Sequence, residues 1–502
     1  MQKKALLLFS VFVVAVCGLV YELLAGTLSS YLLGDSVTHF SLVIGVFLSS
    51  MGLGAWLSKF VRQELLRAFV AVEIWVGLVG GLSALALFAA FAYTTTYLPA
   101  LFGLGGLIGC LIGFEIPLLI RILAEEGVLR VTVSDVLAAD YVGALAASLL
   151  FPTLLVPHLG MMKTSFLFGL MNVAVAYATL RVFKDRIPRR KPLTALCIAS
   201  SLLLGTGFVS SEWTSRRLEA ARYEDDVIYS RQTRYQKIVL TRWRDDVRLF
   251  LDGNLQFCSV DEHRYHESLV HPAMSLAKPE RILVLGGGDG MVLREALKYA
   301  SLREALLVDL DPGMTRLFSS NPMLTRLNGD SLLDPRVRVV NQDAMAYLQD
   351  DEGFYDAVFM DLPDPNSLSL GKLYTTAFFR LAARRLSRNG ILVTQASSPF
   401  YSREAFWCVV NTVKEAMPGA DVKPYHALVP SFGEWGFVMA SRSPMPVARM
   451  EFKVPLRFLN TETARAMFVF PEDLGPLPSP VNRLDDQALV RLYEKGWEKW
   501  NY

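Results

Sequence analysis

The 502-residue sequence has few of the features that mark several common classes of protein. Its five cysteines, Cys17, Cys110, Cys197, Cys258 and Cys408, are scattered without a CxxC pair, which favours neither a disulfide framework nor a cysteine-based metal site. The 50 basic and 48 acidic residues nearly balance, so the net charge of +2 gives no argument for nucleic-acid binding. The first apolar run also lacks a small-residue cleavage site, so we expect a membrane anchor there rather than a removed signal peptide.

Apolar sequence, in contrast, is abundant, and nearly all of the excess lies before Ser211. Seven runs in this part are long enough to span a membrane: roughly 6–24, 40–57, 68–92, 98–119, 136–156, 166–182 and 193–209. We therefore expect residues 1–211 to form an all-α transmembrane domain of about seven helices, and the chain to be a multi-pass protein of the cell membrane.

Basic residues between these runs bear on the orientation in the membrane. They cluster before the first run, at Lys59, Arg62 and Arg67, at Arg121 and Arg130, and from Arg181 to Lys191. The positive-inside rule places such clusters, and with them the N-terminus, in the cytoplasm. An odd number of spans would then put everything after Ser211 outside. This result conflicts with the cytoplasmic chemistry described below, and the sequence leaves the conflict open.

Four acidic residues, Glu22, Glu73, Glu115 and Asp140, lie in or at the edges of the apolar runs. An ionisable group at membrane depth is costly, so each is a candidate for function. Glu22, Glu73 and Asp140 lie near run ends, where local capping or pairing explains them equally well. Glu115, in GFEIPLLI beside Pro117, is the most suggestive of a functional role.

The pattern after Ser211 is that of a soluble protein with two parts and an extension. Residues 226–258 alternate and contain the turn signal LDGN (251–254), which predicts a small antiparallel β unit over 222–275. From 276 to 445, strands at 282–285, 305–308, 337–340, 357–360, 391–395 and 436–440 alternate with helices. This alternation predicts a Rossmann-like, parallel, doubly wound sheet of the methyltransferase type, with the ligand at the carboxyl ends of the strands. Residues 446–502 form a C-terminal extension.

The most informative stretch is ILVLGGGDGMVLRE (282–295), a buried strand followed by a glycine-rich turn and a helix. Glycines such as Gly286 and Gly288 let the backbone turn tightly and approach a nucleoside. Asp309 ends the next strand, in the place of the acidic residue that binds ribose hydroxyls in this fold. Together these residues predict a nucleoside site.

Carboxylates also gather at the strand ends. Asp289, Asp309, Asp343 and Asp361 follow the first four strands of the predicted sheet, and Asp364 lies three residues further on. Because the carboxyl ends of parallel strands share one edge, these groups converge on one crevice. Unpaired carboxylates repel one another in a medium of low dielectric constant, so the site is expected to take a cationic ligand.

The residues from about 223 to 441 resemble the aminopropyltransferases, and spermidine synthase in particular, in the bacterial form with an N-terminal membrane domain. The resemblance is carried in order by RYQKIVL (234–240), LFLDGNLQF (249–257), DEHRYHESLVHPAM (261–274), ILVLGGGDGMVLREALKY, VDLDP (308–312), QDAMAYL (342–348), MDLPDP (360–365) and ILVTQASSP (391–399). It implies transfer of an aminopropyl group from decarboxylated S-adenosylmethionine, a co-substrate, to putrescine, with no metal or other cofactor. It also implies a homo-oligomer and a catalytic domain in the cytoplasm, where the donor is made.

The resemblance also implies a role for each matching residue. Gln236 contacts the nucleoside, Asp309 holds the ribose, and Asp343 with Ala344 faces the adenine. Tyr265 and His266 line the amine channel, and Asp289 binds the amino end of the donor. Asp361 accepts the proton and Asp364 holds the far amine.

The sequence departs from the soluble enzymes in two places. NSLSLGKLY (366–374) replaces a glycine and proline segment that helps close over the ligand, and Phe432 stands where those enzymes have a tyrosine. Both changes bear on which amine is accepted. His263, His266 and His271 do not have the spacing of common zinc sites. Two other functions stay open: a methyltransferase of the same fold, and a polyamine transporter or sensor whose soluble domain only binds the amine.

Overall fold

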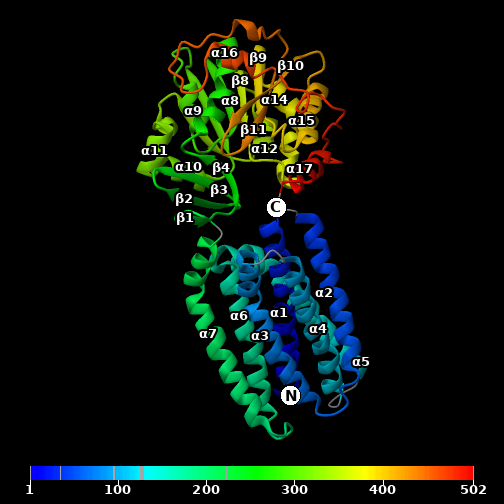
Figure 1. Ribbon diagram of the computed structural model, residues 1–502. Helices are drawn as coiled ribbons and strands as arrows, with labels where there is room; N and C mark the ends of the chain where they lie inside the picture. The colour runs from blue at the N-terminus through cyan, green and yellow to red at the C-terminus, as the bar shows by residue number, and fades with distance from the viewer. Residues whose placement is uncertain (1, 34–35, 94–96, 125–128, 222, 501–502) are drawn as a thin grey trace. The chain divides into compact units, whose positions relative to one another are not determined.

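The computed structural model describes residues 2–33, 36–93, 97–124, 129–221 and 223–500. The chain divides into two compact units, Met1–Glu224 and Asp225–Tyr502. The first is a bundle of helices and the second is an α/β unit, and each is described by itself (Figure 1). The further predicted division of the second part at residues 275 and 445 stays a prediction.

In the described residues the helical unit consists of long apolar helices. Their bounds are α1 (Gln2–Leu33), α2 (Ser36–Ser58), α3 (Leu65–Tyr93), α4 (Tyr97–Ala124), α5 (Leu129–Leu150), α6 (Val156–Val182) and α7 (Arg190–Ala220), with a π-helix at Phe151–Leu155 between α5 and α6. Six helical stretches are long and apolar enough to cross a membrane: Leu6–Ser30, His39–Ser58, Leu65–Tyr93, Tyr97–Ala124, Val133–Val182 and Arg190–Ser215. The first half of the chain therefore has the character of a membrane protein.

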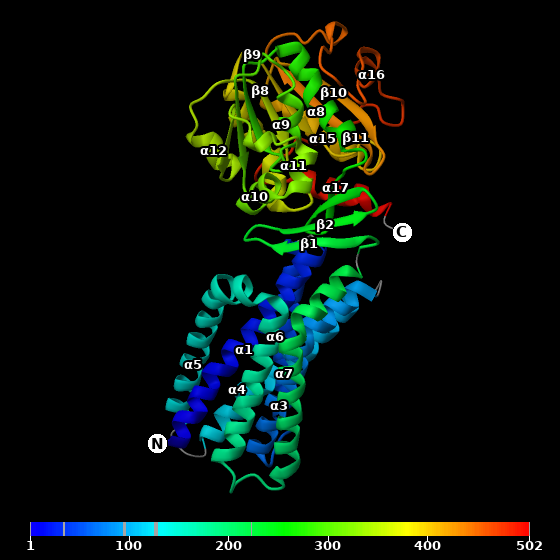
Figure 2. The ribbon, with the colours of Figure 1, turned by 90° about the vertical axis from the view of Figure 1, so that its left-hand side faces the viewer.

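The stretch from Val133 to Val182 contains two of the seven expected spans. Its 50 residues would measure about 75 Å as one straight helix, more than twice the roughly 30 Å of a bilayer core. Gly160, with φ 74° and ψ 170°, breaks the helix inside this stretch. In both views α1 begins at one end of the helical unit and α7 finishes at the other (Figures 1 and 2). The number of membrane crossings stays a prediction.

Glycines set the closest contacts between the helices. A Cβ at Gly113 of α4 would lie 2.1 Å from the carbonyl oxygen of Met51 on α2, and one at Gly109 would lie 2.7 Å from that of Phe47. On the other side of the bundle, a Cβ at Gly77 of α3 would lie 2.7 Å from the carbonyl oxygen of Gly169 on α6. Small residues four apart thus bring helix backbones into contact, the arrangement that favours association inside a bilayer.

The α/β unit begins with a four-stranded antiparallel sheet in the order β1-β2-β3-β4. Its strands are β1 (Asp226–Gln232), β2 (Lys237–Trp243), β3 (Asp246–Leu251) and β4 (Asn254–Cys258). The LDGN sequence forms the β3–β4 hairpin, in which Leu251 pairs with Asn254. Asp252 (φ 49°) and Gly253 (φ 84°) both have positive φ, as a two-residue turn of this kind requires. The predicted β unit is confirmed.

A seven-stranded sheet in the order β10-β11-β9-β8-β5-β6-β7 follows. Its strands are β5 (Arg281–Gly286), β6 (Glu304–Asp309), β7 (Val337–Asn341), β8 (Tyr355–Asp361), β9 (Leu386–Gln395), β10 (Asp421–Val429) and β11 (Gly433–Ser441). Strands β7, β6, β5, β8 and β9 are parallel, whereas β11 pairs antiparallel with β9 and with β10. The predicted doubly wound fold is confirmed, and the antiparallel edge makes the sheet mixed.

Helices cover both faces of this sheet. Val284 of β5 packs into the core that includes side chains from α8 (Glu262–Ala277), α9 (Met291–Ala296), α10 (Pro312–Ser320), α11 (Pro322–Asn328) and α16 (Thr461–Ala466). Leu283, which points to the other face, packs with α12 (Ala344–Asp350), α14 (Thr376–Arg384), α15 (Arg403–Ala416) and α17 (Ala488–Glu498). The short α13 (Leu368–Gly371) precedes α14, and 3₁₀ turns lie at Ser331–Leu333, Lys372–Tyr374 and Val447–Arg449.

Candidate active site

The glycine-rich turn lies at the carboxyl end of β5, against the end of β8. Gly286 has φ 78°, and a Cβ there would lie 2.1 Å from the carbonyl oxygen of Asp361. A Cβ at Gly288 would lie 2.6 Å from the Asp309 carboxylate, which accepts a hydrogen bond from the Gly288 N–H at 3.1 Å. Only glycine fits at these two positions, because the backbone itself contacts the acids of the neighbouring strands.

Asp309 lies at the end of β6, where its two oxygens accept N–H groups of Gly288 and Asp311. Burial raises the pKa of its carboxyl group to about 7. Gln236, just before β2, donates its side-chain N–H to Asp311 at 3.2 Å. The structure thus brings Gln236, Gly288 and Asp309 to one edge of the sheet, as the sequence predicted, although it does not test their roles.

Asp343 has a structural task in addition to its predicted one. One of its oxygens accepts the N–H groups of Met345 and Ala346 and so caps α12, which Ala344 begins. The other accepts the Lys372 ammonium at 2.7 Å. Partial burial raises the pKa of Asp343, but Lys372 and the helix N–H groups outweigh it and hold the pKa below its usual range. Lys372 belongs to the segment that departs from the soluble enzymes.

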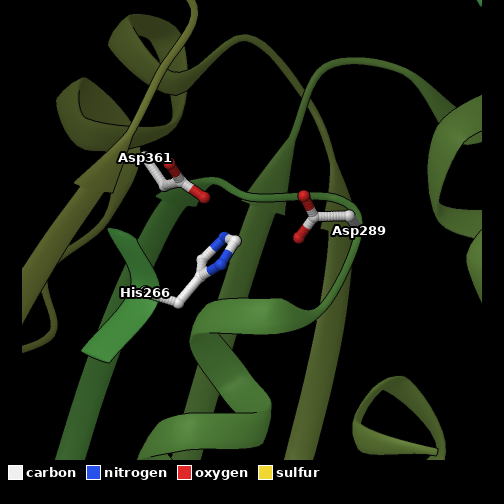
Figure 3. A group of neighbouring side chains, drawn as sticks. All are labelled: His266, Asp289 and Asp361. Atoms are coloured by element: carbon white, nitrogen blue, oxygen red, sulfur yellow. The ribbon is translucent and has the colours of Figure 1, made fainter. Parts of the chain in front are cut away.

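Three side chains from separate elements converge beside this edge: His266 from α8, Asp289 from the glycine-rich turn, and Asp361 from the end of β8. One ligand atom of each lies within 4.8 Å of the other two. The imidazole ring of His266 lies between the two carboxylates (Figure 3). Tyr265, the neighbour of His266, donates its hydroxyl to Asp361 at 2.7 Å. The predicted amine-binding residues are therefore assembled together.

His266 supplies positive charge within this acidic group. Its Nδ1 faces a Glu262 carboxylate oxygen at 2.8 Å, and Arg294 donates to the same carboxylate at 2.8 Å. Burial alone would lower the pKa of His266, but the carboxylates of Glu262, Asp289 and Asp361 raise it to about 9. The ring is thus cationic at neutral pH. The tight Glu262–Arg294 pair has no signal in the sequence motifs, because it forms only when α8 packs on α9.

The acids facing His266 hold their protons more tightly than free aspartates. Asp289 is 8% exposed, and burial raises its pKa to about 6, with the nearby Asp361 adding to the effect and His266 opposing it. Burial also raises the pKa of Asp361, against the effects of His266 and of the Tyr265 hydrogen bond. A pocket that resists the accumulation of negative charge in this way is stabilised by a bound cation.

His266, Asp289 and Asp361 are close enough to share a metal ion, which would require the His266 ring to give up its proton. The other two histidines considered in the sequence do not join them. His271 is fully buried, with one ring nitrogen at 2.8 Å from the Tyr299 hydroxyl and the other at 2.8 Å from Glu295. An organic ammonium group, in contrast, places N–H donors against both carboxylates and needs no neutral imidazole.

Asp364, three residues after Asp361, has partners that the sequence motifs indicated only in part. Gln395, within ILVTQASSP, donates to it at 3.3 Å, and Tyr493 of α17 donates its hydroxyl at 2.8 Å. Burial raises the pKa of Asp364 to about 6 against these two hydrogen bonds. Sequence reasoning missed Tyr493 because it lies in the C-terminal extension, about 130 residues from its partner, with no motif around it.

Both departures from the soluble enzymes lie near this end of the site. The ring of Phe432 contacts that of Tyr265 edge to face, with centroids 6.3 Å apart. The NSLSLGKLY segment forms α13 and the following turn, and Asn482 donates to the carbonyl oxygens of Gly371 and Tyr374. The C-terminal extension therefore holds this segment in place and supplies Tyr493 to the same region.

Comparison with known proteins shows which sequences and structures this chain is similar to. Residues 262–453 match the family model of the spermine/spermidine synthase domain. The chain is 46% identical to a polyamine aminopropyltransferase of Leptospira interrogans over 494 residues, which cover 98% of this chain and 99% of the relative. It is also 46% identical to polyamine aminopropyltransferase 2 of Ralstonia nicotianae over 510 residues, 99% of each chain. A crystal structure of spermidine synthase from Thermotoga maritima aligns with 27% identity and a TM-score of 0.46, over 50% of this chain and 87% of that one.

Proposed function

The chain belongs to the polyamine aminopropyltransferase family, and from that premise we propose that it transfers an aminopropyl group from decarboxylated S-adenosylmethionine to putrescine, giving spermidine and methylthioadenosine. The single observation that supports this choice most directly is the convergence of Asp289 and Asp361 on His266, with Asp364 further along the same edge. Such a row of acids suits the ammonium end of the donor together with an acceptor that has an amino group at each end.

The reaction joins the amine nitrogen of the acceptor to the propyl carbon attached to the donor sulfonium. The new C–N bond forms as the C–S bond breaks, the sulfur takes the bonding electron pair, and the nitrogen loses one proton. The sulfonium is a good leaving group, so alignment of the two substrates supplies much of the rate. Asp361 accepts the proton, and its hydrogen bond from Tyr265 orients the carboxylate for this task.

Asp289 has a second task in this proposal, the choice of donor. The decarboxylated donor ends in an ammonium group, which the carboxylate attracts. Ordinary S-adenosylmethionine carries an additional carboxylate at that end, which Asp289 repels. A methyltransferase of the same fold has no use for such an acid, so this residue favours aminopropyl transfer over methyl transfer.

The nucleoside part of the donor occupies the neighbouring edge of the sheet. In the proposed complex, Gly286 and Gly288 let the backbone approach the ligand, Asp309 binds the ribose hydroxyls, and Gln236 contacts the nucleoside. Asp343 and Ala344 flank the adenine. Asp364 holds the far ammonium of the acceptor, together with the Tyr493 hydroxyl that bonds to it.

A direct assay tests the proposal. Full-length protein in detergent is incubated with the decarboxylated donor and, separately, with putrescine, cadaverine, agmatine or spermidine, and product masses are read. We expect spermidine and methylthioadenosine with putrescine as the preferred acceptor. Preference for another amine would overturn the assignment of putrescine. Methylated product from ordinary S-adenosylmethionine would support the methyltransferase alternative, and amine binding without any transfer would support the transporter or sensor.

The membrane side and the assembly belong to the same proposal. We expect the catalytic unit in the cytoplasm, where the donor is made, and the N-terminus on the other side, since α1 begins and α7 finishes at opposite ends of the helical unit. The basic clusters oppose this orientation by the positive-inside rule. Reporters fused to each end of the chain show which side of the membrane each end occupies. They therefore decide between the orientation expected from the cytoplasmic donor and the one expected from the basic clusters.

A homo-oligomer is also expected, and light scattering of the detergent complex measures the number of chains in it.

A further inference from the structure

The helical unit contains two acidic side chains that the aminopropyl transfer does not use. Glu73 of α3 and Glu115 of α4 are both 0% exposed. None of their four carboxylate oxygens has a hydrogen-bond partner among the described residues. A buried carboxylate is normally paired or hydrogen-bonded, because removing its charge from water is costly. Two such groups in one bundle therefore require an explanation.

Two polar side chains from other helices share this interior. Tyr21 of α1 and Asn172 of α6 are each 1% exposed, and neither the Tyr21 hydroxyl nor the Asn172 amide has a partner among the described residues. Helix α1 packs against both α3 and α4, and α3 packs against α4 and α6, so the helices that carry these groups form one packed set. Four helices thus contribute one unpartnered polar group each.

Close helix contacts fix the positions of these groups. The ring of Tyr21 packs directly on Gly80 of α3, where a Cβ would lie 2.5 Å from the ring. Asn172 packs on Gly77, where a Cβ would lie 3.3 Å from the Asn172 Cβ. Because Glu73, Gly77 and Gly80 follow one another at helical spacing, they share one face of α3. Tyr21 and Asn172 are therefore held on the face that carries Glu73.

The basic side chains with described contacts in this unit are engaged elsewhere. Arg121 donates to the carbonyl oxygens of Ser58 and Val61, at the end of α2. Lys163 pairs with Glu212, and Arg181 donates to the Tyr177 hydroxyl. The interior acids thus have no described cationic side chain as a partner. The two buried glutamates therefore lack a positively charged partner among the described residues.

We propose that Glu73 and Glu115, with Tyr21 and Asn172, form a binding site inside the helical unit for a primary ammonium group, the charged end of a diamine or polyamine. An ammonium group donates three N–H bonds, and the site offers carboxylate, phenol and amide oxygens to accept them. Protons alone would neutralise the carboxylates but would provide no partner for the Asn172 amide.

The choice of an organic ammonium rests on the proposed function, since the acceptor and the product of that reaction are both polyamines. The site itself does not take part in the transfer, so it can fail or succeed independently of the active site. Its location among apolar helices indicates that it serves the passage or sensing of the amine at the membrane.

The test counts amine sites on the full-length protein in lipid nanodiscs, using radiolabelled spermidine at equilibrium. We expect two sites per chain in the wild type and one in the Glu73→Gln, Glu115→Gln double variant. Glu22→Gln, which changes a half-buried acid of α1, is the matched control and should retain two. Each single glutamine variant should weaken the second site by at least about tenfold, since each removes one charged acceptor. Retained aminopropyl transfer and a monodisperse elution profile show that the variants are folded.

The number of bound amines separates the proposed function from the proposed inner site. If the active site does not bind the amine, the wild type has one site and the double variant has none, so the proposed function fails and the inner site stands. If the double variant has as many sites as the wild type, the inner site does not exist. A last measurement compares sodium chloride with the salt of a bulky organic cation at the same ionic strength. Displacement of the inner amine by sodium chloride alone would show that the site binds a metal ion, and would overturn the choice of an ammonium group.

Discussion

At the scale of single residues, the acidic side chains of the candidate active site lower the stability of the free protein. Burial disfavours the charged forms of Asp289, Asp361 and Asp364, Asp361 adds to this effect at Asp289, and His266 is the cation that lies between Asp289 and Asp361. Charged acids in such a place destabilise the free protein, and in the proposed reaction a bound amine would offset this cost. Substitutions here should therefore separate activity from stability.

Replacing Asp361 with Asn should lower turnover by a factor on the order of a hundred or more, because positioned proton transfer typically contributes that much. Affinity for methylthioadenosine should be nearly unchanged, since the nucleoside groups lie on the neighbouring edge. Steady-state kinetics and calorimetry measure the two quantities. Asp356→Asn is the control: Asp356 belongs to the same strand but accepts the N–H groups of Glu280 and Arg281 at its other end. Wild-type turnover in Asp361→Asn would refute its role.

The pKa of Asp289 and that of Asp364, each raised to about 6, predict a pH dependence. Both acids are charged above pH 6, so kcat/KM for the amine should fall as the pH drops through about 6. Stability should move in the opposite direction. A carboxyl group whose pKa is higher in the folded state than in the unfolded state adds to the free energy of unfolding when it is protonated. This contribution is complete below about pH 4 and is lost as the pH rises through 6. Asp364→Asn should therefore raise the Tm at pH 7.5 and not at pH 4. A Tm gain of equal size at both values would contradict the linkage.

Tyr493→Phe should raise KM for putrescine several-fold with little change in kcat. The change removes one charged hydrogen bond to Asp364, worth roughly 1.5 to 3 kcal/mol at most, and leaves Asp361 intact. Tyr401→Phe is the matched control, because Tyr401 stacks on Trp497 of the same helix at a centroid distance of 4.9 Å. Equal effects of the two substitutions would show that Tyr493 acts only through the packing of α17.

Much of the site was predictable at this scale because its residues lie in short, local motifs. Gly286, Gly288 and Asp289 belong to one turn, and Asp364 follows three residues after Asp361 at the end of β8, so spacing alone brings them together. Glu262, Arg294 and Tyr493 could not be found in this way. Their partnerships depend on helix packing between segments far apart in the chain, and an isolated charged or aromatic residue has no periodic signal.

At the scale of elements, periodicity predicted the strands of the parallel sheet and the runs of membrane-spanning length. Strand β10 was missed because its sequence, DVKPYHALV, has charged residues and a proline in place of a continuous apolar run. Proline is tolerated in an edge strand, where its missing N–H faces away from the sheet, and β10 is such an edge. The break at Gly160, in contrast, lies between the predicted runs 136–156 and 166–182, where the loss of apolar sequence predicted a connection.

The contact between α2 and α4 gives a test at this scale. Gly113→Ala should destabilise the helical unit, because the new Cβ would lie 2.1 Å from the carbonyl oxygen of Met51 and would force the helices apart. Gly103→Ala on the same helix is the control, since a Cβ there meets nothing within 4 Å. Thermal unfolding in detergent should show a Tm several degrees lower for the first variant only. Similar Tm values for both variants would show that α2 and α4 can separate at little cost.

At the scale of the whole molecule, the proposed catalytic groups all lie in the unit Asp225–Tyr502, which has its own core on both faces of the sheet. A shortened chain that begins at Tyr223 should therefore fold and transfer aminopropyl groups in detergent-free buffer. Its kcat should be within a few-fold of that of the full-length protein in detergent. Circular dichroism and the mass-based assay check folding and activity separately. A folded but inactive shortened chain would show that the helical unit completes the active site.

The position of His266 also has a kinetic consequence. A pocket with acids alone would hold any diamine or triamine for a long time, and spermidine, with one more positive charge than putrescine, would remain bound the longest. The imidazolium between Asp289 and Asp361 competes with every incoming ammonium for the same carboxylates. In the proposed reaction we therefore expect His266 to shorten the residence time of the polyamine product and to limit inhibition by it.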